Sequence, residues 1–166
     1  MFVRYHSRMD YQAIIKAPFG LVGIRCDGDA LAGIDFLAAG IKLQSPSSSF
    51  SRKVCEQLAA YFSDPDFYFD LPIKIASTEY RSKVWQAMRA IPHGEVQTYG
   101  ELAERLQSSP RAIGQACGAN PIPIVIPCHR VVSKAGLGGF MHHREGDALN
   151  IKRWLLAHET KHVIPV

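Results

Sequence analysis

The stretch "TYGELAERLQSSPRAIGQACGANPIPIVIPCHRVV", residues 98–132, decides the fold of the second half of this chain. Thr98 opens a T-x-x-E capping box, which predicts the start of a short helix. Ser109 and Pro110 suit the N-cap and the first position of a second helix, and Pro121 ends that helix. Two short helices joined by a few residues predict a helix-turn-helix, whose second helix can enter a DNA groove.

An apolar run of Ile, Val and Pro then leads directly into Cys128, His129 and Arg130. A cysteine attacks as the thiolate, so a reactive Cys128 needs a base that takes its proton. His129 is next in sequence, but neighbours on an extended chain point to opposite sides, so a water or a bend should lie between the two groups. A buried Arg130 needs an acidic partner. These residues alone leave open that Cys128 is an ordinary core cysteine.

Helices on both sides of this stretch complete a mostly helical second half. Apolar spacing predicts one helix from about residue 78 to 91 and a last helix that begins near Asp147. The predicted inner face of the first helix consists of Tyr80, Val84, Met88 and Ile91. The predicted inner face of the last helix consists of Ile151, Trp154, Leu155 and His158.

The first half has the pattern of a small sheet and a helix. Residues 10–36 contain short apolar runs around "DGD", residues 27–29, which predicts a β-hairpin. Residues 40–49 have the composition of a loop, and apolar residues recur at helical spacing over 50–62. No residue of this half points to chemistry, and its cysteines are expected to be buried small hydrophobes.

The expected fold class is therefore an α/β N-terminal domain, residues 1–76, with a small antiparallel sheet plus a helix. A mostly α-helical C-terminal domain with a helix-turn-helix, residues 77–166, follows it. The chain has 166 residues, of which 47% are hydrophobic and 20% charged, which is typical of a globular protein. No apolar run approaches the roughly 20 residues of a membrane helix, and the N-terminus lacks the apolar core of a signal peptide. A cytoplasmic protein is expected.

The cysteines and the charges limit the partners further. The four cysteines lie far apart without a C-x-x-C pair, so neither a disulfide framework nor a metal site is expected. Of the 19 Lys and Arg, 8 lie in residues 1–76 and are balanced by 8 Asp and Glu. Residues 77–166 hold the other 11 Lys and Arg against 7 Asp and Glu, which is the whole net charge of +4. A mildly basic second half favours a polyanion partner.

Four blocks in the second half resemble one family. "GEVQTYGELA", "RAIGQACGANP", "PIPIVIPCHRVV" and "IKRWLLAHE" are similar, in order and at close to the same spacing, to the O6-alkylguanine-DNA alkyltransferases, also called methylated-DNA–protein-cysteine methyltransferases. The resemblance covers about residues 78–160, and its P-C-H-R-V signature is highly specific. The first half resembles the family only in its hairpin-then-helix plan.

The resemblance implies direct-reversal DNA repair. The chain would transfer a methyl or larger alkyl group from O6-alkylguanine in double-stranded DNA to Cys128, once and irreversibly, as a monomer without a cofactor. O4-methylthymine stays open as a further substrate. In the implied catalytic set, His129 is a water-mediated base for Cys128, Glu159 orients His129, and Asn120 braces the turn. Arg130 is structural and pairs with an acid in the core.

The resemblance also implies the DNA contacts and the substrate pocket. Arg111 would fill the gap that the flipped base leaves in the stack, and Ser109 lies beside it at the DNA-binding helix. Tyr99 would lie by the flipped base, with its hydroxyl able to bond guanine N3. The carbonyl of Val131 would face the guanine amino group.

The segment after "SKAGLGG" departs from the family. Phe140 stands where the family has a tyrosine, and Met141 stands at the next, usually small position; both are expected to form the pocket wall. The loop over 140–147 is several residues longer than in the family. Its His142, His143 and Arg144 would either reach a phosphate or form a solvated loop.

Three other functions compete with alkyl transfer. A non-catalytic alkyl-lesion binding protein would lack the acceptor cysteine, which is present here. A cysteine hydrolase would release product beyond one equivalent. A helix-turn-helix transcription regulator would need sequence-specific binding and usually a dimerisation element, and the sequence resembles none.

Overall fold

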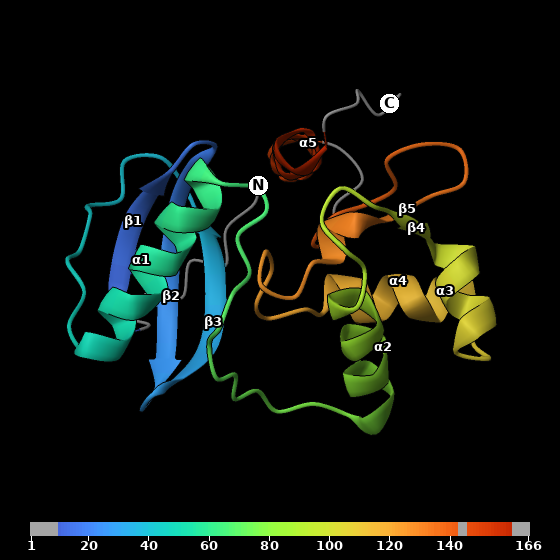
Figure 1. The fold of residues 1–166 in the computed structure, drawn as a ribbon, viewed down its shortest axis with the longest axis horizontal. Helices are drawn as coiled ribbons and strands as arrows, with labels where there is room; N and C mark the ends of the chain where they lie inside the picture. Colours follow the sequence, from blue (N-terminus) through green and yellow to red (C-terminus); the bar gives the residue numbers. More distant parts are fainter. Residues whose placement is uncertain (1–9, 143–145, 161–166) are drawn as a thin grey trace. The chain divides into compact units, whose positions relative to one another are not determined.

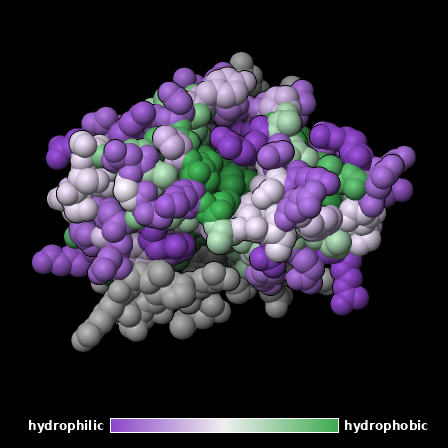
Figure 2. Space-filling view, turned by 90° about the horizontal axis from the view of Figure 1, so that it is seen from below, coloured by the Kyte–Doolittle hydropathy of each residue, from purple (hydrophilic) through white to green (hydrophobic). Residues whose placement is uncertain are grey.

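The structure is a computed structural model in which residues 10–142 and 146–160 are described. The chain divides into two compact units, Met1–Ile75 and Ala76–Val166 (Figure 1). In the face seen in Figure 2, hydrophilic residues cover most of the surface and hydrophobic residues show over a smaller area. No helix in the described part of the chain is long and apolar enough to cross a membrane.

The first unit is a three-stranded antiparallel sheet with a helix across one face (Figure 1). Its elements are β1 (Ala13–Ala17), β2 (Gly20–Asp27), β3 (Ala30–Leu37) and α1 (Ser49–Ser63). The predicted hairpin is confirmed: Asp27 pairs with Ala30, and Gly28 at φ +60° takes the first place of the two-residue turn. Val54 and Leu58 of α1 are fully buried, so the helix and sheet close a small core.

Two further segments pair with the edges of the sheet, one around Gln44, which was predicted as loop, and one around Ile73. Ile14 and Gln44 exchange two backbone hydrogen bonds, each of 3.0 Å. Leu31 donates to the carbonyl of Pro72 at 2.7 Å and accepts from Lys74 at 3.0 Å. An edge strand leaves a row of unpaired backbone groups, which these segments satisfy.

The second unit is mostly helical. Its elements are α2 (Glu79–Arg89), β4 (Gln97–Thr98), α3 (Tyr99–Arg105), α4 (Pro110–Gly118), the 3-10 helix η1 (Cys128–Arg130), β5 (Val131–Val132) and α5 (Asp147–Glu159). Thr98 and Ser109 cap α3 and α4 as predicted, and Glu101 completes the capping box. The short parallel pair β4 and β5 ties the start of α3 to the residues that follow η1.

The predicted inner faces of α2 and α5 are each wrong in part. Tyr80 is 37% exposed at the start of α2, and Trp85 is buried instead, with its indole N–H donating to the carbonyl of Ala116 at 2.9 Å. A buried indole needs such an acceptor, and the end of α4 supplies it. Trp154 and His158 stack on each other at 4.6 Å on the partly exposed side of α5. Its buried side carries Ala148, Leu149, Ile151, Lys152, Leu155, Leu156 and Glu159.

Candidate active site

Cys128 begins the one-turn 3-10 helix η1, so the backbone bends here, which is one of the two possibilities that the sequence left open. The amide of Cys128 donates to the carbonyl of Ile126 at 2.8 Å, and that of Arg130 donates to Pro127 at 3.0 Å. In such a turn, consecutive side chains are about 120° apart and do not point to opposite faces. The backbone itself therefore bends between Cys128 and His129.

Asn120 braces the loop that leads into this turn. It is 2% exposed, its amide nitrogen donates to the carbonyl of Ile126 at 2.8 Å, and its oxygen accepts from the amide of Ile122 at 3.0 Å. Between these anchors, Ile124 has φ +77°, a conformation that is rare for a β-branched residue. The hydrogen bonds of Asn120 hold this strained loop, and with it the start of η1.

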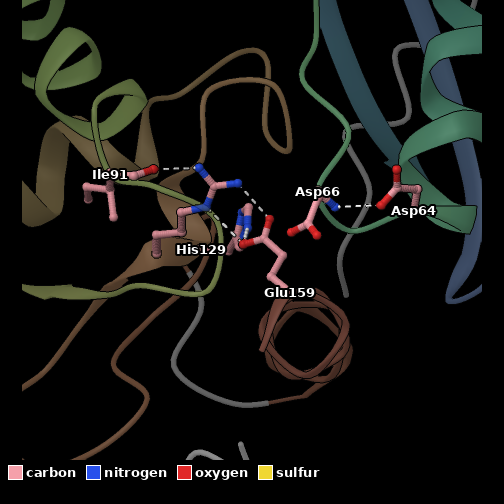
Figure 3. Close-up of polar contacts among 6 residues, drawn as sticks. Asp64, Asp66, Ile91, His129 and Glu159 are labelled. Atoms are coloured by element: carbon pink, nitrogen blue, oxygen red, sulfur yellow. Dashed lines mark hydrogen bonds and ion pairs between the residues drawn. The ribbon is translucent and has the colours of Figure 1, made fainter. Parts of the chain in front are cut away.

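The two residues that follow Cys128 belong to a buried charged cluster with Glu159 (Figure 3). Glu159 reaches from the end of α5, and its Oε1 lies 2.9 Å from Nε2 of His129. The guanidinium of Arg130 donates to both carboxylate oxygens of Glu159, at 2.8 and 2.7 Å, and to the carbonyl of Ile91 at 2.7 Å. The sequence predicted an orienting acid for His129 and an acidic partner for Arg130; one residue, Glu159, occupies both places.

The charges in this cluster follow from burial and pairing. Burial opposes ionisation of Glu159, but interactions with His129 and Arg130 outweigh it and hold the pKa of Glu159 well below its usual range. Burial lowers the pKa of His129, against the pull of Glu159, so its ring is neutral. A carboxylate only accepts hydrogen bonds, so Nε2 of His129 carries the ring proton and Nδ1 carries the lone pair. Within the described residues, Nδ1 is a buried side-chain atom without a hydrogen-bond partner.

The thiol of Cys128 is 3% exposed and is difficult to ionise without help. Burial raises the pKa of Cys128 to about 11, although a hydrogen bond from Asn120 and the charge of Lys152 pull it part of the way back. At neutral pH the group is a thiol, so a base must take its proton at the moment of attack. Nδ1 of His129, the next residue in the chain, has a free lone pair and can act as this base.

Lys152 is a site residue that the sequence reasoning missed. It is fully buried on α5, and its ammonium donates to the carbonyl of Val131 at 2.7 Å and to that of Gly139 at 2.8 Å. Burial lowers the pKa of Lys152 to about 8. Its position was a usable signal, because it lies seven residues, or two helical turns, before Glu159 and so shares the buried face of α5.

A pocket of about 920 Å³ opens onto Cys128 and carries much of the predicted site. Tyr99, Arg111, Phe140 and Met141 line it together with Cys128. The hydroxyl of Tyr99 donates to the carbonyl of Gly139 at 3.3 Å, and its ring lies 5.9 Å from the ammonium of Lys152.

His142 also lines this pocket, whereas Val131 and Ser109 do not. Val131 is fully buried, and its carbonyl accepts from Lys152. A carbonyl has two lone pairs, so this bond leaves room for a second donor. Ser109 is the exposed N-cap of α4. His143 and Arg144 lie outside the described residues.

A second cysteine, Cys117, lines the same pocket and is buried. Burial raises the pKa of Cys117 well above its usual range, and the charge of Cys128 adds to this effect. Its thiol donates to the sulfur of Met88 at 3.5 Å. Cys117 therefore stays protonated and hydrogen-bonded, while Cys128 has a base beside it. In the described part of the chain, no group of three or more His, Cys, Asp or Glu residues has the arrangement of a metal site.

Comparisons with known proteins find relatives that cover both halves of this chain. Residues 79–161 match the family described as "6-O-methylguanine DNA methyltransferase, DNA binding domain". The methylated-DNA–protein-cysteine methyltransferase of Methanosarcina acetivorans is 36% identical over 154 residues, which cover 88% of this chain and 96% of the relative. The Mycobacterium tuberculosis O6-methylguanine methyltransferase structure is 33% identical, with a TM-score of 0.75 over 92% of this chain and 93% of that one. The structure of Mycobacterium tuberculosis OGT in complex with DNA is 34% identical, with a TM-score of 0.73 over 88% and 90%.

Proposed function

Because the chain belongs to the 6-O-methylguanine DNA methyltransferase family, we propose that it repairs DNA by moving an alkyl group from the O6 atom of guanine to Cys128. The observation that carries this proposal is the geometry behind the thiol. Cys128 faces a pocket, and the adjacent buried His129 presents a lone pair at Nδ1 while Glu159 holds its other nitrogen. A nucleophile, a base and an orienting acid in this order form the usual arrangement for covalent catalysis.

In the proposed transfer, the thiol proton of Cys128 passes through a water to Nδ1 of His129, as the sulfur attacks the alkyl carbon. A carbon–sulfur bond forms and the carbon–oxygen bond breaks, and its electron pair stays on guanine. The guanine anion takes up one proton from solvent, and His129 later releases one proton to solvent. The imidazolium that forms is stabilised by the fixed carboxylate of Glu159. The product is a thioether, which water does not cleave, so each chain reacts once.

Mass spectrometry of the intact protein tests this function. After incubation with a duplex that contains O6-methylguanine, the chain should gain one methyl group, and peptide mapping should place it on Cys128. A second equivalent of released product would indicate a hydrolase. Lesion binding without any gain in mass would indicate a non-catalytic binding protein.

Helices α3 and α4 are proposed to act as the helix-turn-helix that holds the DNA, with α4 as the recognition helix. The support is their mutual packing, the exposed N-terminus of α4 with its positive dipole end, and the basic second half of the chain. Ser109 caps α4 and Arg111 is exposed in its first turn. Since one chain holds the acceptor, the base and both helices, the proposed active form is a monomer.

Arg111 is proposed to fill the gap in the base stack when the damaged base is flipped out. Replacement by alanine should slow repair of duplex DNA by about tenfold or more, because unstacking costs a few kcal/mol that the side chain partly offsets. Reaction with the free alkylated base needs no flipping and should keep its rate. Rate constants on both substrates measure this. Arg153→Ala, which removes an exposed arginine of α5, is the control for lost charge. Equal losses on duplex and free base would contradict the role.

Lys152 is proposed to hold the pocket together by joining two carbonyls, those of Val131 and Gly139. Lys152→Met should lower the free energy of unfolding by about 2 kcal/mol, because the buried carbonyl of Val131 loses a charged donor and the part-buried carbonyl of Gly139 keeps only the hydroxyl of Tyr99. It should also slow transfer, since the charge that lowers the pKa of Cys128 is gone. Urea unfolding and the transfer rate are the measurements. Lys134→Met, at an exposed lysine, is the matched control. Unchanged stability would rule out the bracing role.

A further inference from the structure

His142 packs its ring against the backbone of Gly118, the last residue of α4. A Cβ atom on Gly118 would overlap Nδ1 and Cε1 of the His142 ring and lie 2.8 Å from its Cγ. The ring therefore occupies space that any other residue at position 118 would fill. On the same helix, a Cβ atom on Gly114 would meet nothing within 4 Å. The contact is thus specific to the end of α4.

The backbone that presents this ring is strained. Met141 has φ +51° and His142 has φ +66°, so two consecutive residues with side chains lie in the left-handed region. Two such residues in succession are typical of a type I′ turn, which favours Asn and Gly for steric reasons. Neither residue here is of that kind. Contacts must hold the turn, and those that the described residues show include the burial of Phe140, which is 3% exposed, and the His142 ring on Gly118.

The ring lies at the acceptor pocket. His142, Met141 and Gly118 line the same pocket as Cys128. Cys117, next to Gly118, also lines this pocket. The ring thus joins the loop to the end of α4 at the wall of the pocket that holds the acceptor sulfur.

We propose that His142 is a specificity-determining residue whose ring, seated on Gly118, limits the size of the alkyl group that the pocket admits. This inference rests on the proposed transfer to Cys128. A methyl group on O6 adds little volume to guanine, and the pocket accepts it with the ring in place. A benzyl group needs the space of a second ring, so His142 must leave Gly118. His142 is exposed, and displacement carries its ring outward into solvent.

Two single variants and their combination test the limit. The second-order rate constants for O6-methylguanine and O6-benzylguanine, both as free bases, give a benzyl-to-methyl ratio for each protein. His142→Ala removes the ring, and Gly118→Ala displaces it without changing His142. Each should raise the ratio by about tenfold, the usual scale for steric discrimination in a pocket. The double variant should exceed neither single one, because both remove the same contact. Gly136→Ala makes the same substitution in open space, at a residue that does not line the pocket, and should leave the ratio unchanged.

The outcomes separate this inference from the function on which it rests. A wild-type protein that transfers no methyl group to Cys128 would overturn the proposed function itself. With methyl transfer intact, a ratio that His142→Ala leaves unchanged would overturn the size limit. Fully additive effects in the double variant would show that Gly118 does not seat the ring. A ratio raised equally by Gly136→Ala would assign the effect to an added methyl group in general and would also overturn the proposal.

Discussion

Replacing Cys128 by serine should abolish alkyl transfer and leave DNA binding within about threefold of the wild-type affinity, because phosphate contacts supply most of that affinity. A hydroxyl is a far weaker nucleophile than a thiol at neutral pH, and the buried position of residue 128 disfavours its anion further. The loss in rate should exceed about 10³-fold. The intact mass after incubation with O6-methylguanine duplex measures transfer, and a DNA titration measures affinity.

The matched control for this variant is Cys55→Ser. Cys55 is a half-buried thiol on α1, in the unit that carries no proposed chemistry, and burial raises its pKa to about 11, the same value as for Cys128. If a high thiol pKa alone decided reactivity, both cysteines would behave alike. Full activity in Cys55→Ser, with none in Cys128→Ser, would show that the surroundings of Cys128, and not its thiol pKa alone, decide reactivity. Methyl transfer that persists in Cys128→Ser would assign the acceptor role to another residue.

Replacing His129 by glutamine should slow transfer by about 10²–10⁴-fold at pH 7, the usual contribution of a general base. The loss should shrink as the pH rises. Burial lowers the pKa of His129, so the wild-type base is already neutral at pH 7 and gains nothing at higher pH. Without the base, the variant reacts only through free thiolate, whose fraction grows about tenfold per pH unit up to the Cys128 pKa of about 11.

The quantity to measure is the wild-type rate divided by the variant rate at each pH. Lys152 loses its proton around pH 8 in both proteins, so its effect largely cancels in that ratio. His158→Gln, a partly exposed histidine that stacks on Trp154, is the control for loss of an imidazole. If the ratio of wild-type to His129→Gln rates stays constant from pH 7 to pH 9, His129 positions the turn and does not act as a base.

His129 also makes the free energy of unfolding depend on pH. The folded state holds His129 neutral, and its pKa lies below the unfolded value, so the unfolded chain binds more protons as the pH falls. The depressed pKa of Glu159 acts in the same direction at lower pH, because its salt bridge with Arg130 is lost on protonation. Both groups therefore stabilise the fold above their unfolded pKa values and lose that contribution in acid.

Much of the fold could be predicted from the sequence because its signals are local. Capping at Thr98 and Ser109 depends on residues within one turn, and both helices begin where the sequence places them. The hairpin at Asp27 depends on a glycine that accepts positive φ. The error on Tyr80 has a different origin: spacing identifies a helix, but which neighbour covers it decides whether Tyr80 or Trp85 is buried.

The sequence by itself determined the chemistry of the candidate site, since Cys128 and its neighbour His129 are adjacent in the chain. It also determined the caps and the family resemblance on which the remaining residues were proposed. Only the tertiary structure decided that Glu159 serves both His129 and Arg130, that Lys152 is buried beside the pocket, and that His142 lies on Gly118. These contacts join residues 21 to 30 positions apart, and a pattern in one segment carries no information on the segment that will pack against it. Their physical origin is burial, because a charge or a strained turn is kept in place only when the partners that the fold brings to it compensate its cost.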